Sequence, residues 1–186
     1  MRPGAAQPRD ILQALDSGAA GIVAPHVDSA EAAGRLARAC RFGQGGRGYA
    51  GSTRWAGFAT RPMDELLRKS RDETVVIAQI EEPEGVEAAA AIAGTDGIDG
   101  LFLGPADLSV GYGRTDQSGP ELMAALASVG EAAQAAGRAY MTFVPDAAKA
   151  AEWRRFGLTM FFVASEHSWM RAGASAAARG IHGLAD

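Results

Sequence analysis

The sequence predicts an α/β fold built on a parallel sheet. Short apolar runs alternate with helical segments, and glycines stand at the junctions between them. This alternation favours parallel pairing through βαβ units, and near-continuous apolar strands are typical of a sheet covered by helices. We count about six strand–helix units without a linker, which indicates one domain over residues 1–186. A doubly wound sheet and an incomplete barrel both fit this rhythm.

The elements follow one another in a regular order. Strands are predicted at residues 21–27, 75–81, 100–103, 139–144 and 160–165. Helices are predicted at residues 8–17, from Ser29 to about Phe42, and at 63–70, 84–93, 119–137, 146–156 and 166–179. Gly18 suits a helix C-terminus and Ser29 suits a helix N-cap. The clearest strand is VVIAQIE, which is β-branched, apolar and ends in a carboxylate.

Composition excludes several functional classes. The 186 residues are 47% hydrophobic and 22% charged, and the net charge of −4 gives no reason to expect nucleic-acid binding. No apolar run approaches the roughly 18 residues that span a membrane, and the N-terminal residues do not resemble a signal peptide. Cys40 is the single cysteine, which excludes an intrachain disulfide and a thiolate metal cage. We therefore expect a cytoplasmic protein.

Two carboxylates stand where parallel folds place their chemistry, at the carboxyl ends of strands. Glu81 ends one predicted strand, and Asp107 follows the next by a short turn, at a separation of 107 − 81 = 26 residues. Both are expected at the same rim, with Gln79 on the same strand face as Glu81. Carboxylates without thiols suit Mg²⁺ or Mn²⁺, which a 2-oxo acid can chelate so that its enolate is stabilised. Arg47, in the glycine-rich segment, is a candidate for holding the remaining negative charge.

Simpler interpretations compete with each of these assignments. A glutamate at a strand end is more often a surface or capping group than a ligand, and Asp107 can instead cap a turn at residues 108–110. The segment GQGGRG at 43–48 formally fits a dinucleotide motif, but a helix precedes it where that motif needs a strand. His26 can face the pocket or be structural, and Glu166 with His167 fits the start of a helix.

Three segments resemble one known family. IAQIEEPEGVEAAAAIAGTDGIDGLFLGPADLS at 77–109 is similar to the core of the HpcH/HpaI aldolases, which are related to the citrate lyase β subunit. GIVAPHVDSAEAA at 21–33 and RGYAGSTRW at 47–55 match the same family in the same order. The pairing of QIE with GPADLS favours its aldolase branch.

The resemblance implies a (β/α)8 TIM barrel of the phosphoenolpyruvate/pyruvate type, usually assembled as a hexamer. Glu81 and Asp107 match the family's ligands for a divalent metal, which is Mg²⁺ or Mn²⁺ with Co²⁺ as a further option. Arg47 matches the arginine that contacts the substrate and stabilises the transition state, while Gln79, Ala106 and Asp107 match substrate-contacting positions. The implied substrates are pyruvate or a related 2-oxo acid and an aldehyde, with neither nucleic acid nor membrane as a partner.

The sequence departs from the family at its beginning. The family's barrel opens with two further strands, and the second of them ends in an aspartate–histidine pair used for acid–base chemistry. The match here begins at the helix before the family's third strand, so we expect a barrel that lacks the first two strands. Such a barrel exposes two sheet edges, and another chain or a rearrangement is expected to cover them.

Three hypotheses follow. The first is a metal-dependent class II aldolase acting on a 2-oxo acid. The second is a catalytically silent barrel remnant with a binding or assembly role. The third is citrate-synthase-like or citryl/malyl-lyase-like condensation on the same scaffold, which product analysis distinguishes from an aldol reaction.

Overall fold

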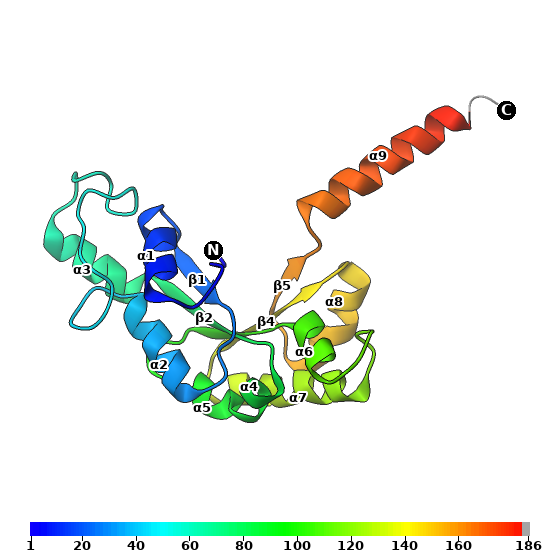
Figure 1. The fold of residues 1–186 in the computed structure, drawn as a ribbon, viewed down its shortest axis with the longest axis horizontal. Helices are drawn as coiled ribbons and strands as arrows, with labels where there is room; N and C mark the ends of the chain where they lie inside the picture. The colour runs from blue at the N-terminus through cyan, green and yellow to red at the C-terminus, as the bar shows by residue number, and fades with distance from the viewer. Residues whose placement is uncertain (184–186) are drawn as a thin grey trace.

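A computed structural model describes residues 1–183 and shows a curled sheet of parallel strands (Figure 1). The strands occur in the spatial order β1-β2-β3-β4-β5, so each strand pairs with its successor in the sequence. A doubly wound sheet would reverse its order part-way, whereas a barrel adds strands in one direction. The fold is therefore a five-stranded parallel half-barrel. Its strands are β1 Gly21–Ala24, β2 Val75–Ile80, β3 Gly100–Leu103, β4 Ala139–Val144 and β5 Met160–Val163.

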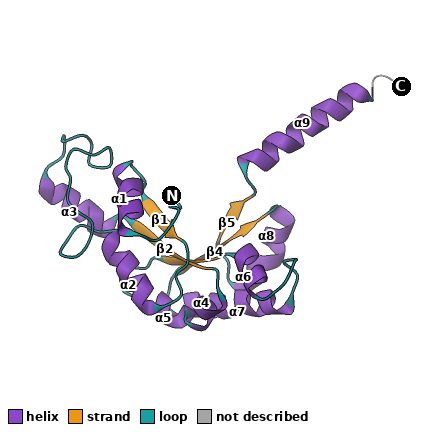
Figure 2. Ribbon diagram, viewed as in Figure 1, coloured by secondary structure: helices purple, strands orange, loops and turns teal. Residues whose placement is uncertain are grey.

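Helices cover the convex face of the sheet in a continuous arc (Figure 2). Alternate residues of β2 divide between the two faces. Val76, Ala78 and Ile80 belong to the main core under the helices, whereas Ile77 packs with Phe102 on the concave face. The helices are α1 Pro8–Asp16, α2 Ala30–Ala39, α3 Met63–Asp72, α4 Pro83–Glu87, α5 Ala89–Ala93, α6 Pro105–Gly111, α7 Pro120–Ala135, α8 Ala147–Trp153 and α9 Glu166–His182, with a 3₁₀ turn at Arg154–Phe156.

Most predicted elements are confirmed, and the differences have local causes. The described residues form five strands and not about six. The strand predicted at 21–27 ends at Ala24, because Pro25 has no N–H to donate and His26 is left-handed with φ 56°. The helix predicted at 84–93 is divided at Ala88, whose ψ is 1°. The Ser29 hydroxyl caps α2 by accepting from the Ala32 N–H, as predicted.

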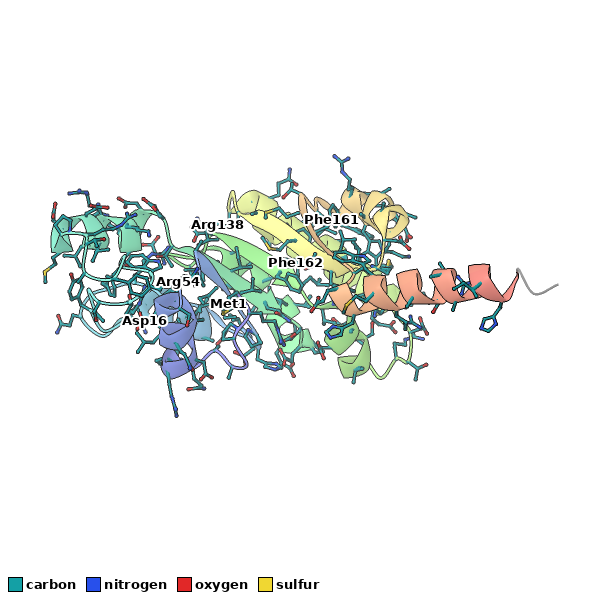
Figure 3. The ribbon with its side chains drawn as sticks, turned by 90° about the horizontal axis from the view of Figure 1, so that it is seen from above. Met1, Asp16, Arg54, Arg138, Phe161 and Phe162 are labelled. Atoms are coloured by element: carbon teal, nitrogen blue, oxygen red, sulfur yellow. The ribbon has the colours of Figure 1, made fainter. Side chains whose placement is uncertain are left out.

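The first residue of the chain extends the sheet beyond β1. The Met1 amino group donates to the Gly21 carbonyl at 2.8 Å, and the Val23 N–H donates to the Met1 carbonyl at 2.9 Å. This is the hydrogen-bond pattern of a parallel ladder. Figure 3 shows Met1 beside the sheet. Arg2, which follows, therefore leaves the ladder toward the carboxyl end of β1.

The concave face and the C-terminal helix leave apolar surface exposed. Phe162 of β5 packs edge-on against Phe102 at 5.3 Å between ring centroids and is still 46% exposed, whereas its neighbour Phe161 packs against the helix-side core (Figure 3). Helix α9 begins at a Ser165 capping box, consistent with the helix start predicted at Glu166, and projects away from the half-barrel (Figure 1). No helix within residues 1–183 is long and apolar enough to cross a membrane.

Candidate active site

The centre of the candidate site is Glu81, the first residue after β2. Its side chain is buried, with 1% of the residue exposed. The His26 backbone N–H donates to Oε1 at 2.9 Å, and the Gln79 side-chain amide donates to Oε2. The predicted alternation is confirmed, because Gln79 and Glu81 leave the strand on the same side and meet. Two donors from different elements thus hold this carboxylate in one orientation.

The surroundings of Glu81 also set its proton affinity. Burial raises the pKa of the Glu81 carboxyl, and the hydrogen bond from the His26 backbone opposes this rise. The negative charge of Asp107 raises the same pKa further. A buried carboxyl of this kind is stabilised as an anion by a neighbouring cation.

Glycine at position 104 lets β3 approach Glu81 closely. In the sheet register Ile80 lies beside Leu103, so Glu81 and Gly104 are neighbours just beyond the strand ends. A Cβ atom at position 104 would lie 2.9 Å from the Glu81 Cβ and 3.1 Å from Oε2. Gly104 is also the N-cap of α6. Any other residue at this position would displace the carboxylate.

Asp107 lies in the first turn of α6 and is exposed at the same rim. The alternative that Asp107 caps the turn at 108–110 is wrong, because the N-cap is Gly104. Ala106 is also exposed and lines a cleft of about 520 Å³ next to Asp107. Arg114, Lys149 and Phe143 are among the other residues of this cleft.

The structure does not bring Arg47 to this rim. Its guanidinium, fully buried, pairs with Asp16 at 2.5 Å at the end of α1 and stacks on the Phe42 and Trp55 rings at 4.5 and 4.7 Å. Figure 3 shows Asp16 on α1, which precedes β1. The Arg47 N–H donates to the carbonyl of Arg41.

Arg41 in turn fixes which end of the sheet this cluster occupies. Its guanidinium donates to the carbonyls of Thr74 and Gly97, which precede β2 and β3. From Thr74 to Glu81 is 81 − 74 = 7 residues, or about 23 Å of extended strand. The expectation that the glycine-rich segment carries Arg47 to Glu81 is therefore not met. These glycines turn the chain at the amino-terminal rim.

The arginine that does reach the site is Arg2, which the sequence interpretation missed. Its Nε donates to the Gln79 side-chain oxygen at 3.2 Å, and Gln79 in turn donates to Glu81. Within the part of the chain that the structure describes, this is the only hydrogen bond made by the Arg2 guanidinium. The remaining N–H groups are available to an anionic ligand. Arg2 reaches Gln79 because Met1 pairs with β1, a contact that the sequence does not indicate.

An imidazole and a second carboxylate lie beside Glu81. The His26 Nδ1 is 3.2 Å from Glu81 Oε1 and 2.5 Å from Glu82 Oε1. The Glu82 hydrogen bond raises the pKa of the His26 imidazole. His26, Glu81 and Glu82 each offer one atom within 4.8 Å of the others. The buried Oε2 of Glu82 has no hydrogen-bond partner, so this donor set suits a divalent cation.

Comparisons with known proteins identify the family. The family model described as HpcH/HpaI aldolase/citrate lyase matches residues 1–172. The chain belongs to this family. A hydroxypyruvate/pyruvate aldolase of Paraburkholderia phytofirmans is 33% identical over 86% of this chain and 63% of its own length. A 4-hydroxy-2-oxo-heptane-1,7-dioate aldolase of Salmonella paratyphi B is 32% identical over 96% of this chain and 68% of its own length.

A solved structure agrees with the fold. The crystal structure of a family member from Burkholderia cenocepacia superposes with a TM-score of 0.90 at 33% identity, over 97% of this chain and 72% of that one. The chain therefore spans roughly two thirds of the length of the curated relatives that it matches, 63% and 68% in the two cases above. The half-barrel corresponds to part of a larger fold in this relative.

The positions of Arg47 and Arg2 predict different effects on stability. Arg47→Ala leaves the partly buried Asp16 carboxylate unpaired and removes the guanidinium from two aromatic rings. We expect the free energy of unfolding to fall by about 3 kcal/mol, the low end for breaking a buried pair because Asp16 keeps some solvent contact. Arg2→Ala, at an exposed residue, is the matched control and should change it by less than about 0.5 kcal/mol. Urea unfolding followed by circular dichroism measures both, and equal effects would contradict the assignment of Arg47 to structure.

Proposed function

We propose that this chain carries the metal and enolate half of a class II aldolase site, which joins or splits a pyruvate-type 2-oxo acid and an aldehyde. The observation that carries this proposal is the buried Glu81 carboxylate. It is held at the carboxyl end of β2, beside the strand that leads into Asp107, and is joined to Arg2 through Gln79. Burying an ionised carboxylate at a strand end costs desolvation free energy unless a cation compensates its charge.

In this proposal Glu81 and Asp107 hold a divalent ion, which is Mg²⁺ or Mn²⁺ with Co²⁺ as a further option. A divalent ion at such a site supplies Lewis-acid stabilisation of an enolate. Each Glu81 oxygen accepts one hydrogen bond and keeps a second lone pair for the cation. The hydrogen bonds from His26 and Gln79 keep the carboxylate in place before the cation arrives, which lowers the cost of binding.

The polar groups around Glu81 position the 2-oxo acid. The Arg2 N–H groups that do not bind Gln79 belong to a planar, permanently charged guanidinium. A guanidinium suits the substrate carboxylate or a developing enolate oxygen. Gln79 fixes the angle of that guanidinium by accepting from Nε at 3.2 Å. Arg2 therefore takes the role that the resemblance assigned to Arg47.

The aldehyde is proposed to enter from the cleft of about 520 Å³ that Ala106 lines. The small Ala106 side chain leaves room beside Asp107. The apolar Phe143 and the cations Arg114 and Lys149 line the same cleft. The names of the relatives, which include hydroxypyruvate/pyruvate aldolase, support a short 2-oxo acid as the other substrate.

The proposal predicts activity that depends on both the cation and Glu81. We expect retro-aldol cleavage of a 4-hydroxy-2-oxo acid in Mn²⁺ or Mg²⁺, abolished by EDTA. Glu81→Gln should lower kcat/KM by about 10²-fold or more, as for other electrostatic groups at a reacting centre. Glu31→Gln, at an exposed glutamate that pairs with Arg35, is the matched control and should keep full activity. A coupled pyruvate assay measures the rates.

Several outcomes would contradict this proposal or redirect it. Activity that survives EDTA or Glu81→Gln would exclude the metal centre. A citrate-type product from oxaloacetate and an acyl donor would favour condensation over aldol chemistry. Lack of any turnover by a folded, cation-loaded protein would favour the binding or assembly role.

The close approach of Gly104 to Glu81 makes a second prediction. Gly104→Ala places a methyl group 2.9 Å from the Glu81 Cβ and should push the carboxylate out of position. We expect Mn²⁺ affinity to fall by about tenfold or more, a loss typical of disturbed ligand support. Gly48→Ala at the amino-terminal rim, where an added Cβ meets nothing within 4 Å, is the control. Calorimetric titration with Mn²⁺ measures both affinities, and unchanged binding by Gly104→Ala would show that Glu81 does not need this glycine.

We also propose that the chain forms a homo-oligomer through α9. Trp169, Met170 and Ile181 are 60%, 62% and 70% exposed on this projecting helix. Single apolar side chains at a surface are ordinary, but an isolated helix of this length is only marginally stable in water. Light scattering after size exclusion should give a multiple of 19.2 kDa. Trp169→Ser with Met170→Ser should shift this mass toward the monomer, and a monomeric wild-type protein would refute the proposal.

A further inference from the structure

The strongest unassigned feature of the described residues is the histidine at the Glu81 carboxylate. His26 comes from the loop after β1, whereas Glu81 and Glu82 follow β2. One ligand atom from each of these three residues lies within 4.8 Å of the other two. Neither the chemistry proposed above nor the family resemblance gives the His26 imidazole or the Glu82 side chain a role.

The distance between His26 and Glu81 fits a shared cation. Two ligands at adjacent corners of an octahedron with bonds of about 2.1 Å lie about 3.0 Å apart. The His26 Nδ1 and the Glu81 Oε1 are separated by 3.2 Å. A cation can therefore bind both atoms without moving either side chain far.

Backbone hydrogen bonds hold the His26 main chain, and with it the start of its side chain, close to Glu81. The His26 N–H donates to the same Glu81 oxygen at 2.9 Å, and the Val27 N–H donates to the Gln79 carbonyl at 3.0 Å. These two bonds tie the loop after β1 to the end of β2. Small movements of the imidazole therefore leave Nδ1 near Glu81.

Glu82 gives a separate indication that a cation belongs at this cluster. Its Oε2 atom is buried and has no hydrogen-bond partner, although Oε1 contacts His26 at 2.5 Å. A buried carboxylate oxygen without a donor is costly, and an ion adjacent to it removes the cost. The net charge of the two glutamates exceeds what one imidazole can balance.

We propose that the His26 Nδ1 is a protein ligand of the same divalent cation that Glu81 holds. This inference rests on the proposed metal centre and extends its ligand set from two carboxylates to two carboxylates and an imidazole. An imidazole suits Co²⁺ better than Mg²⁺ or Mn²⁺, which prefer oxygen ligands, although Mn²⁺ also accepts a nitrogen ligand. The site therefore favours a transition metal, and the negative charge of Glu82 beside His26 further stabilises the cation.

Electron spin echo modulation on the full chain tests the ligand directly. Metal-free protein is loaded with substoichiometric Mn²⁺, and a directly bound imidazole nitrogen gives a characteristic ¹⁴N modulation of the Mn²⁺ signal. We expect this modulation in the wild-type protein and its replacement by a ¹⁵N pattern after labelling with [¹⁵N]histidine. The measurement needs no substitution, so it does not depend on a variant that folds.

Substitutions then assign the nitrogen to one of the three histidines in the chain. His26→Gly removes the imidazole and accepts the left-handed backbone at φ 56° while keeping the N–H that binds Glu81. It should lose the ¹⁴N modulation and weaken Co²⁺ binding by about tenfold or more, with a smaller effect on Mg²⁺. His167→Ala, at an exposed histidine beside Glu166, is the matched control and should change neither result.

The possible failures are distinguishable. Mn²⁺ bound in a Glu81-dependent way but without ¹⁴N modulation overturns the role of His26 and leaves the proposed aldolase site intact. Modulation that persists in His26→Gly overturns it equally. Binding that Glu81→Gln does not weaken, or no binding by the wild-type protein, overturns the metal centre itself.

Discussion

A carboxylate buried at the end of a parallel strand is the constraint on which the rest of this site depends. An ionised Glu81 that is 1% exposed is costly unless neighbouring donors and a cation stabilise it. Its donors come from two sources, the His26 backbone N–H and the Gln79 amide. The left-handed turn at His26 and the missing side chain at Gly104 are both required to hold Glu81 in this position. The left-handed backbone at His26 and the glycine at position 104 therefore both help to position the Glu81 carboxylate.

The half-barrel topology explains why these groups meet. Parallel strands in sequential order bring every strand's carboxyl end to the same rim, so the loops after β1, β2 and β3 become neighbours. Met1 pairs with β1 at the edge of the sheet, and this pairing places Arg2 next to Gln79. Two ladder hydrogen bonds between Met1 and β1 thus bring a guanidinium to a site otherwise made of carboxylates, a histidine and an amide.

At the amino-terminal rim of the sheet arginines have structural contacts, and the proposed chemistry lies at the opposite rim. At the amino-terminal rim Arg47 is enclosed between aromatic rings and Asp16, and Arg41 bonds carbonyls that precede β2 and β3. The side chains of these arginines cannot reach a ligand at the opposite rim, which is about 23 Å away along the strand. The arginines therefore differ in their surroundings because of the end of the sheet at which each lies.

Much of the fold and part of the site could be predicted from the sequence. Apolar periodicity located all five strands of the described sheet and the glycine junctions, because burial on a pleated surface leaves a direct pattern in residue type. The spacing of 26 residues between Glu81 and Asp107 also placed both carboxylates at one rim, because one strand–helix unit returns the chain to the same edge. The resemblance implied a metal-dependent aldolase and assigned its substrate-contacting arginine to Arg47, which the structure places at the other rim.

What only the tertiary structure decided is which other groups join those carboxylates. The segment at 43–51 has no periodicity that indicates a direction, so the rim reached by Arg47 was undetermined by sequence. A single residue, Met1, cannot show a strand pattern, so Arg2 gave no signal. His26 was ambiguous for a similar reason: its backbone conformation, and with it the contact to Glu81, arises from hydrogen bonds between loops that are 55 residues apart. Sequence by itself determines local periodicity, whereas contacts between loops depend on how the whole sheet closes.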